Sequence, residues 1–312
     1  MVRHVTKITS LSRSEVKQVL ALAGSMKARP ADFGRDLERK SLLMLFEKPS
    51  LRTRVSLEVG MTQLGGHAIP YMTGDSPIGK KETYEDTAAV LSRMADAVTA
   101  RVKSRDQVVG LARTATIPII NALDDFAHPM QMLADMLTMA EHCRGSFDAD
   151  LDGLVVAFVG DLENNVTYDL MRSAALMGMT IHLAGPPSCT IEAEVLAECA
   201  DLAPDAVQRF ETAEAAVAGA DVVYADSWMS YGIDAQARAA RFDALLPFQV
   251  TTDLMRLAKP GAKFMNCLPA MRGEEQTADV IDGPQSIVFD QAENRLHAQK
   301  ALLSLLIHGT VA

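Results

Sequence analysis

The sequence predicts an α/β protein with two doubly wound domains, each built around a parallel sheet. With 312 residues the chain is longer than one hydrophobic core usually holds, which favours two domains. Short apolar runs alternate with segments of helical periodicity in both halves, the pattern of parallel βαβ units. Polar residues gather where the apolar runs end, and ligands bind at that edge of a parallel sheet. The expected domains are residues 1–145 and 146–292.

The elements of the first half follow from the apolar runs and the turn residues between them. The run at 42–46 predicts a buried strand that Pro49 ends, and the apolar periodicity from Leu57 predicts a helix that Gly65 ends. By the same reasoning we expect strands at 68–72, 97–100 and 117–122, helices at 9–27, 83–92, 106–114 and 132–142, a loop at 73–82 and a domain junction at 144–153.

The second half repeats this pattern. Its continuous apolar run at 154–159 predicts a strand that is buried on both faces. We expect further strands at 180–184, 220–225, 263–265 and 286–289, and helices at 166–177, 191–199, 248–258 and 293–308.

Composition excludes several classes of protein. The formal net charge of -10 and the pI of about 5.2 argue against a nucleic-acid partner, although local arginines could still bind an anionic substrate. No run is long and apolar enough to act as a signal peptide or to span a membrane, so we expect a soluble cytoplasmic protein without a membrane partner. Four widely spaced cysteines predict free thiols. Seven scattered histidines give no metal spacing, so we expect no metal and no cofactor.

The segment between the first strand and the next helix could bind an anion. Ser50 and Thr53 offer hydroxyl donors, Arg52 offers a planar guanidinium, and a helix that begins here points its backbone N–H groups at the same spot. There is no glycine-rich run of the Walker type. On these residues alone, a capped helix with solvated arginines is an equal alternative.

Other strand ends carry similar groups. Arg101 follows an apolar strand, and it either needs an anionic partner or pairs with Asp106 at the surface. In His128-Pro129-Met130-Gln131, the proline fits the first position of a helix, and His128 and Gln131 could donate to a carbonyl oxygen. The alternative is a surface turn with a solvated histidine.

The second half offers groups that suit an amino acid. Residues 160–165 lack a G-x-G-x-x-G pattern, but they end in two asparagines whose amides could bind an ammonium and a carboxylate. Asp226 is a candidate counter-ion for an ammonium, and Cys267 could be a nucleophile. The alternatives are a polar turn for the asparagines, a helix cap for Asp226, a buried inert thiol for Cys267 and a solvated helix position for Arg295.

Five strings, in order along the chain, resemble motifs of the aspartate/ornithine carbamoyltransferase family, and most closely its ornithine branch. S-L-R-T-R at 50–54 resembles S-x-R-T-R, and H-P-M-Q at 128–131 resembles H-P-x-Q. D-S-W-M-S-Y-G at 226–232 resembles D-x-W-x-S-M-G, N-C-L-P at 266–269 resembles H-C-L-P, and E-N-R at 293–295 resembles the C-terminal E-N-R.

The resemblance implies carbamoyl transfer from carbamoyl phosphate to the side-chain amine of L-ornithine, with no metal and no cofactor. It implies that the catalytic residues are Arg101, His128, Asp226 and Cys267. Carbamoyl phosphate would be bound by Ser50, Leu51, Arg52, Thr53, Arg101, His128, Gln131, Cys267, Leu268 and Arg295. The amino acid would be bound by Asn165, Asp226, Ser230 and Tyr231. Cys267 and Asp226 would present a neutral amine, and Leu268 would contribute its backbone carbonyl.

The resemblance also implies an architecture. The helix after His128 and the last helix would join the two domains, with 293–312 packing back on the first, carbamoyl-phosphate-binding domain. The family implies a homotrimer, in which the loop 74–82 reaches a neighbouring subunit.

Three departures from the family motifs leave the acceptor open. Asn266 stands for the histidine of H-C-L-P, Tyr231 stands for the methionine of S-M-G, and the segment 160–165 is one residue longer than G-D-x-N-N. The alternative acceptors are a modified ornithine, putrescine or lysine; aspartate is disfavoured because Asp226 would repel its second carboxylate. A non-catalytic ligand-binding relative and a dehydrogenase are the competing classes.

Overall fold

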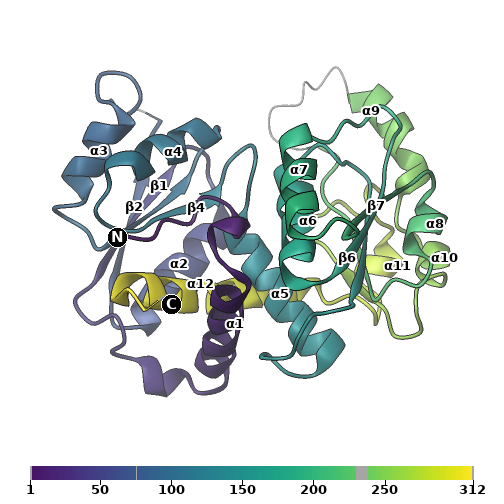
Figure 1. Ribbon diagram of the computed structural model, residues 1–312, viewed down its shortest axis with the longest axis horizontal. Coiled ribbons are helices and arrows are strands. Elements are labelled where there is room, and N and C mark those ends of the chain that lie inside the picture. Colours follow the sequence, from purple (N-terminus) through teal and green to yellow (C-terminus); the bar gives the residue numbers. More distant parts are fainter. Residues whose placement is uncertain (1, 75, 230–237, 311–312) are drawn as a thin grey trace. The chain divides into compact units, whose positions relative to one another are not determined.

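The computed structural model describes residues 2–74, 76–229 and 238–310. The chain forms two compact units (Figure 1). The first comprises residues 1–137 and 293–312, and the second comprises residues 138–292.

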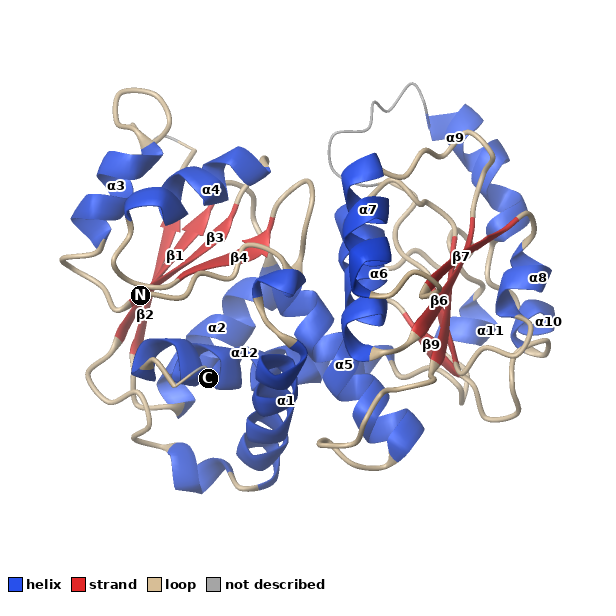
Figure 2. Ribbon diagram, in the orientation of Figure 1, coloured by secondary structure: helices blue, strands red, loops and turns tan. Residues whose placement is uncertain are grey.

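The first unit is a doubly wound α/β unit. Its parallel sheet has the strand order β2-β1-β3-β4 and is formed by β1 (Ser41–Phe46), β2 (His67–Met72), β3 (Ala97–Arg101) and β4 (Ile119–Leu123). Helices cover both faces of the sheet, with α3 and α4 on one face and α2 on the other (Figure 2). The helical elements are η1 (Ile8–Ser10), α1 (Arg13–Ala28), η2 (Pro30–Phe33), α2 (Leu51–Gln63), α3 (Tyr84–Leu91) and α4 (Arg105–Thr114).

Strand register brings the predicted polar segments of this unit to one edge. Phe46, the last residue of β1, is paired in register with Arg101, the last residue of β3. The loop to α2 leaves from the same edge, and so does the turn after β4 that leads to His128. The alternation of strand and helix therefore places distant motifs side by side.

The second unit repeats this plan with five parallel strands in the order β7-β6-β5-β8-β9. They are β5 (Val155–Val159), β6 (Thr180–Ala184), β7 (Val207–Phe210), β8 (Val222–Tyr224) and β9 (Lys263–Met265). In Figure 1, α6 and α7 cover one face, and α8, α10 and α11 cover the other. The helical elements are α6 (Asn165–Met177), α7 (Ala193–Leu202), α8 (Ala213–Val217), α9 (Arg238–Leu245), η4 (Leu246–Phe248), α10 (Thr252–Met255) and α11 (Ala278–Ile281).

Two long helices carry the chain from one unit to the other. The change from the first unit to the second falls inside α5 (Pro129–Arg144), and the return falls inside α12 (Val288–His308). The α/β class, the two parallel sheets and the two connecting helices are as predicted. The C-terminal half of α12 packs on α2 in the first unit, where Gln299 Nε2 donates to the Ser56 hydroxyl at 2.7 Å.

Some predicted elements were wrong. The strand expected at 286–289 is absent, since Ser286 makes an isolated bridge to Phe264 and α12 already begins at Val288. The helix expected at 248–258 is reduced to the four residues of α10. Strand β7 and helices α8, α9 and α11 were not predicted. Strand β7 is a short edge strand whose central residues are exposed and polar, and each of the three helices is short.

The sequence predicted that no segment of the chain spans a membrane. None of the helices in residues 2–74, 76–229 and 238–310 combines the length and the apolar composition that crossing a bilayer requires.

Candidate active site

The first half of the candidate site begins at the N-terminus of α2. Ser50 is its N-cap residue, with an extended backbone and no capping hydrogen bond from its side chain. The N–H groups at the start of a helix have no partner within the helix, so they and the helix dipole favour an anion here. Thr53, in the first turn, is only 1% exposed. The order strand, turn and helix is as the sequence predicted.

The Thr53 hydroxyl lies between two guanidinium groups. Arg101, at the end of β3, donates from Nη1 to Thr53 Oγ1 at 3.5 Å, and Arg295, on α12, donates from Nη2 to the same oxygen at 3.2 Å. Arg101 and Arg295 are both buried. This excludes the alternative of solvated surface arginines at these two positions. Two buried cations around one hydroxyl form a binding site for an anion with several oxygen atoms.

His128 is buried beside the same cations, at the residue before α5 begins with Pro129. Burial lowers the pKa of His128 well below its usual value, and the charges of Arg295, Arg101 and Arg52 lower it further. The imidazole is therefore neutral at pH 7, and a neutral imidazole can donate one N–H without adding a fourth positive charge. Its neighbours exclude the surface-turn alternative.

Amide groups orient Arg295. Gln131 accepts from Arg295 Nη1 at 2.5 Å and donates to Asp135 at 2.8 Å. Gln299, turned so that its oxygen faces Arg295, accepts from Nε and Nη2 at 3.1 Å each. Sequence reasoning found Gln131 through the H-P-M-Q string but missed Gln299, which lies one helical turn beyond Arg295 on α12 and belongs to no motif.

The second group of predicted residues gathers at the carboxyl edge of the second sheet. Tyr224 of β8 and Met265 of β9 are paired in register, and Asp226 and Cys267 each lie two residues further along. The Cys267 thiol donates to Asp226 Oδ1 at 3.1 Å. Burial raises the pKa of Asp226, and the nearby Asp161 raises it as well. The pair gives this edge a negative character that suits an ammonium group.

The asparagine segment after β5 is also at this edge. Asn164 caps α6, accepting from the Thr167 N–H at 2.9 Å and donating to the Asp161 carbonyl at 2.9 Å. Asn165 is then the first residue of the helix. The turn explanation therefore holds for Asn164, and the binding role of Asn165 stays a prediction. Ser230 and Tyr231 lie outside the described residues.

Arg241 contacts both the loop after β5 and the loop after β8. It forms an ion pair with Asp161, after β5, and donates from Nε to the carbonyl of Trp228, after β8, at 2.6 Å. Trp228 is buried and packs edge-to-face on Phe242 of α9, with ring centroids 5.3 Å apart. Sequence reasoning assigned Trp228 to packing, which is confirmed, and it missed Arg241.

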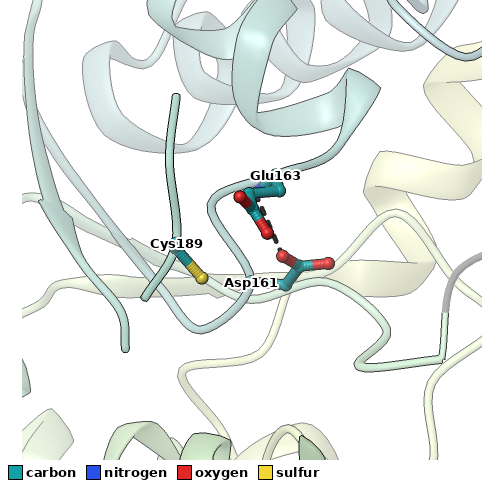
Figure 3. Close-up of side chains that lie close together, drawn as sticks. All are labelled: Asp161, Glu163 and Cys189. Carbon is teal, nitrogen blue, oxygen red and sulfur yellow. Dashed lines mark hydrogen bonds between the residues drawn. The ribbon is translucent and has the colours of Figure 1, made fainter. Parts of the chain in front are cut away.

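Asp161, Glu163 and Cys189 lie close together in this region (Figure 3), with one ligand atom from each within 4.8 Å of the others. The carboxylate oxygens that could bind a metal already have protein partners. Asp161 pairs with Arg241 and accepts from the Glu163 N–H, and Glu163 accepts from the Thr190 N–H at 2.7 Å. Burial raises the pKa of the Cys189 thiol, which disfavours the thiolate that would bind a metal. This group is therefore a poor cation site, and the expectation of no metal stays a prediction.

Glu275 is an acidic residue of this unit that sequence reasoning missed. It is fully buried, and its Oε1 accepts from the Met271 N–H at 2.9 Å. Burial raises the pKa of Glu275 to about 7, and the charges of Asp226 and Glu274 add to the effect. A second buried carboxyl group close to Asp226 makes this edge unfavourable for the negative charge of a ligand.

We expect Glu275→Gln to stabilise the protein more at pH 8 than at pH 5. The pKa of Glu275 is raised in the native state, so its penalty is absent below the unfolded pKa, grows as pH rises through about 7, and then stays constant. The shift corresponds to a ceiling of about 3 kcal/mol at pH 8. Glutamine keeps the acceptor for Met271. Thermal unfolding at the two pH values measures the difference, and equal gains at both would contradict it.

Comparison with known proteins places both halves of the chain in one family. Residues 3–141 match the carbamoyl-P binding domain, and residues 152–306 match the Asp/Orn binding domain, of aspartate/ornithine carbamoyltransferase. The chain is 44% identical over 307 residues to "Ornithine carbamoyltransferase, catabolic" of Halobacterium salinarum, covering 98% of this chain and 99% of that protein. It is 45% identical over 309 residues to the ornithine carbamoyltransferase of Halorhodospira halophila, covering 98% and 99%.

Solved structures agree with the sequence comparison. The ornithine carbamoyltransferase of Pyrococcus furiosus has a TM-score of 0.92 and 43% identity, covering 98% of this chain and 97% of that chain. The ornithine transcarbamoylase of Giardia lamblia has a TM-score of 0.90 and 42% identity, covering 99% of both chains. The anion site of the first unit, the amine-compatible pair of the second and these full-length matches lead to one conclusion: the chain belongs to the aspartate/ornithine carbamoyltransferase family.

Proposed function

We propose that the chain transfers the carbamoyl group of carbamoyl phosphate to the side-chain amine of L-ornithine and releases L-citrulline and phosphate. The observation that carries this proposal is the convergence of Arg101, Arg295 and neutral His128 around Thr53, at the N-terminus of α2. The names of the full-length relatives support ornithine as the acceptor.

In this proposal, the first unit binds carbamoyl phosphate. Ser50, Leu51, Arg52 and Thr53 hold the phosphate through side chains and helix N–H groups, together with Arg101. His128, Gln131 and Arg295 fix the carbamoyl group. When the amine attacks the carbamoyl carbon, negative charge develops on the carbonyl oxygen, and donors that are already in place stabilise that charge.

The second unit binds ornithine in this proposal. Asp226 and Cys267 take the side-chain amine, with the Leu268 carbonyl as a further acceptor, and Asn165, Ser230 and Tyr231 contribute to the head group. The ammonium loses one proton before attack, and Asp226 can accept it. A C–N bond then forms, the bond from carbon to the phosphate oxygen breaks, and the departing phosphate carries away the second proton. No covalent bond to the protein is needed.

A colorimetric assay for ureido products tests the function. The acceptors are L-ornithine, N-acetyl-ornithine, N-succinyl-ornithine, putrescine, L-lysine and L-aspartate, each with carbamoyl phosphate. We expect turnover of L-ornithine and little of the others. A different preferred amine would overturn the acceptor, and binding of carbamoyl phosphate without turnover of any amine would reduce the chain to a ligand-binding relative.

We further propose that the chain works as a homotrimer. An apolar patch in the first unit supports a second copy as the partner: Leu51, Val55 and Val59 are exposed on one face of α2, and Ile69, Tyr71 and Met72 are exposed on the edge strand β2 that packs beside it. Exposed apolar groups that gather on neighbouring elements are typical of interaction surfaces.

We expect Val55→Glu to break the assembly, because it places a charge in the middle of that patch. Val55 is 47% exposed. Val109→Glu is the matched control, since Val109 is an exposed valine (40%) on α4, outside the patch. Light scattering after size-exclusion chromatography measures the mass. A trimer that survives V55E, or that V109E breaks equally, would count against this interface.

We propose the cytoplasm as the compartment and arginine biosynthesis as the pathway. The free cysteines are consistent with a reducing compartment. Growth of an arginine auxotroph that lacks its own carbamoyltransferase tests the pathway, because rescue without added arginine requires net synthesis of citrulline in the cell.

A further inference from the structure

Asn266 stands where the family motif H-C-L-P has a histidine, directly after β9 and directly before Cys267. Its side chain is fully buried. Each of its polar atoms has a protein partner: Oδ1 accepts from the Leu268 N–H at 2.8 Å, and Nδ2 donates to Gln276 Oε1 at 3.1 Å. Both polar atoms of the Asn266 side chain therefore bond within the protein, at a position that is closed to solvent.

The bond to Leu268 holds an uncommon backbone conformation. Leu268 has a φ of 57°, in the left-handed region that residues with a Cβ seldom adopt. A hydrogen bond from its N–H to Asn266 fixes the peptide group between Cys267 and Leu268. The direction of the Leu268 carbonyl and the position of the thiol that donates to Asp226 both depend on this stretch of backbone.

Gln276 completes the arrangement from a separate loop. It is fully buried, and its Nε2 donates to the Met271 carbonyl at 3.2 Å. On the other side, the Asn266 backbone N–H donates to Gln291 Oε1 at 2.9 Å, and Gln291 donates to the Tyr224 hydroxyl at 3.0 Å. Uncharged groups thus hold Asn266 from β8, α12 and the loop before α11.

We propose that Asn266 and Gln276 form an uncharged positioning pair that holds the Leu268 carbonyl and the Cys267 thiol in place for the acceptor amine, without touching the acceptor. This inference rests on the proposed carbamoyl transfer. It means that the change from histidine to asparagine leaves the class of acceptor unaltered.

The chemistry of the amide explains how it can stand in for an imidazole. Both groups can accept at one atom and donate at another. An imidazole that gains a proton loses its acceptor, whereas an amide does not titrate. Among the described residues, the titratable groups near Asn266 include Asp226 after β8, the neighbouring Cys267, Glu275 in the loop before α11 and Tyr224, which Gln291 joins to the Asn266 N–H. Within this set, the amide pair keeps its geometry while the carboxyl groups change charge.

Asn266→Ala should lower kcat/KM for L-ornithine by about 10- to 100-fold, because the Leu268 N–H and Gln276 each lose a buried partner. KM for carbamoyl phosphate should change less than kcat/KM for ornithine, because residues of the first unit bind the phosphate in the proposed function. L-norvaline, which has the head group of ornithine but no side-chain amine, should keep its inhibition constant, since the pair acts on the groups that face the amine. A general structural defect would weaken norvaline as much as ornithine.

Two further variants distinguish loss of the positioning pair from general misfolding. Gln276→Leu keeps the bond from Asn266 to Leu268 but removes the outer partner, so it should lower kcat/KM for ornithine in the same direction by about 3- to 10-fold. Gln249→Ala is the matched control, because Gln249 donates to the Gly273 and Glu274 carbonyls of the same loop without reaching Asn266. We expect Q249A to keep wild-type kinetics.

Asn266→His supplies a pH signature. Its neutral imidazole can accept from the Leu268 N–H, so the variant should use ornithine with kcat/KM close to wild type at pH 8.5. As pH falls and the imidazole gains a proton, the ratio of variant to wild-type kcat/KM should drop. Taking the ratio removes the titration of Asp226 and Glu275, which both proteins share.

The outcomes separate this inference from the proposed function. If the wild type carbamoylates ornithine while N266A and Q276L keep full kcat/KM, or lose norvaline and ornithine equally, the positioning pair is wrong and the function stands. A ratio for N266H that does not vary with pH, or a new preferred acceptor in N266H, also overturns it. If the wild type does not carbamoylate ornithine, the proposed function fails before any variant is compared.

Discussion

Arg101→Met is expected to lower kcat/KM for carbamoyl phosphate by about three orders of magnitude, equivalent to about 4 kcal/mol of transition-state stabilisation. Arg101 is buried at the end of β3, and it donates to the same Thr53 hydroxyl as Arg295. Methionine fills a similar volume but offers no donor and no charge. The phosphate and the developing oxyanion would both lose a charged donor, and a buried charged donor has a larger effect than an exposed one.

The loss in R101M should appear in binding and in catalysis but not in folding. Removing one of several neighbouring positive charges relieves repulsion, so the melting temperature without ligand should not fall, whereas the stabilisation by carbamoyl phosphate or phosphate should shrink. Arg54→Met is the matched control, because Arg54 lies two residues beyond Arg52 and pairs with Glu58 on the surface of α2. Equal losses in R54M and R101M, or wild-type kinetics in R101M, would show that the cradle is misassigned.

The sequence predicted the first unit well because its information is local. Each motif there follows an apolar strand, and parallel strands bring their carboxyl ends to one edge whatever lies between them. Arg101 and His128 could therefore be expected at one place, although their alternatives as surface residues could not be excluded. Burial excluded those alternatives, and burial depends on packing that no single string of residues contains.

Residues that act through distant partners were beyond sequence reasoning. Gln299, Arg241 and Glu275 belong to no recognised string, and each meets its partner only after the sheet has formed. Arg241 reaches back 80 positions to Asp161. Glu275 was missed for another reason, because a glutamate in a polar segment is expected to be exposed to solvent. Its complete burial, which raises its pKa toward neutrality, is visible only in the structure. The sequence showed that Asn266 departs from the H-C-L-P motif, but only the structure shows its partners, the Leu268 N–H and the Gln276 side chain.

Asp226→Asn is expected to lower kcat/KM for L-ornithine by about three orders of magnitude, with little change in KM for carbamoyl phosphate. Asp226 carries the negative charge of the pair with Cys267, whose thiol donates to it at 3.1 Å. Asparagine has the same shape and can still accept from the thiol, but it has no negative charge to attract an ammonium and it cannot take its proton. Asp243→Asn, which changes an exposed carboxylate on α9, is the matched control.

The pKa of Asp226 gives the same variant a signature in stability. Because burial raises this pKa above its ordinary value, the ionised carboxylate costs the native state free energy once pH exceeds the raised value. D226N removes that cost, so it should unfold at the same or a higher temperature than the wild type at pH 8. A variant that is at least as stable and yet nearly inactive with ornithine would identify Asp226 as a group kept for its charge. Loss of stability together with activity would instead show that Asp226 supports the fold, and wild-type kinetics with ornithine would remove it from the acceptor site.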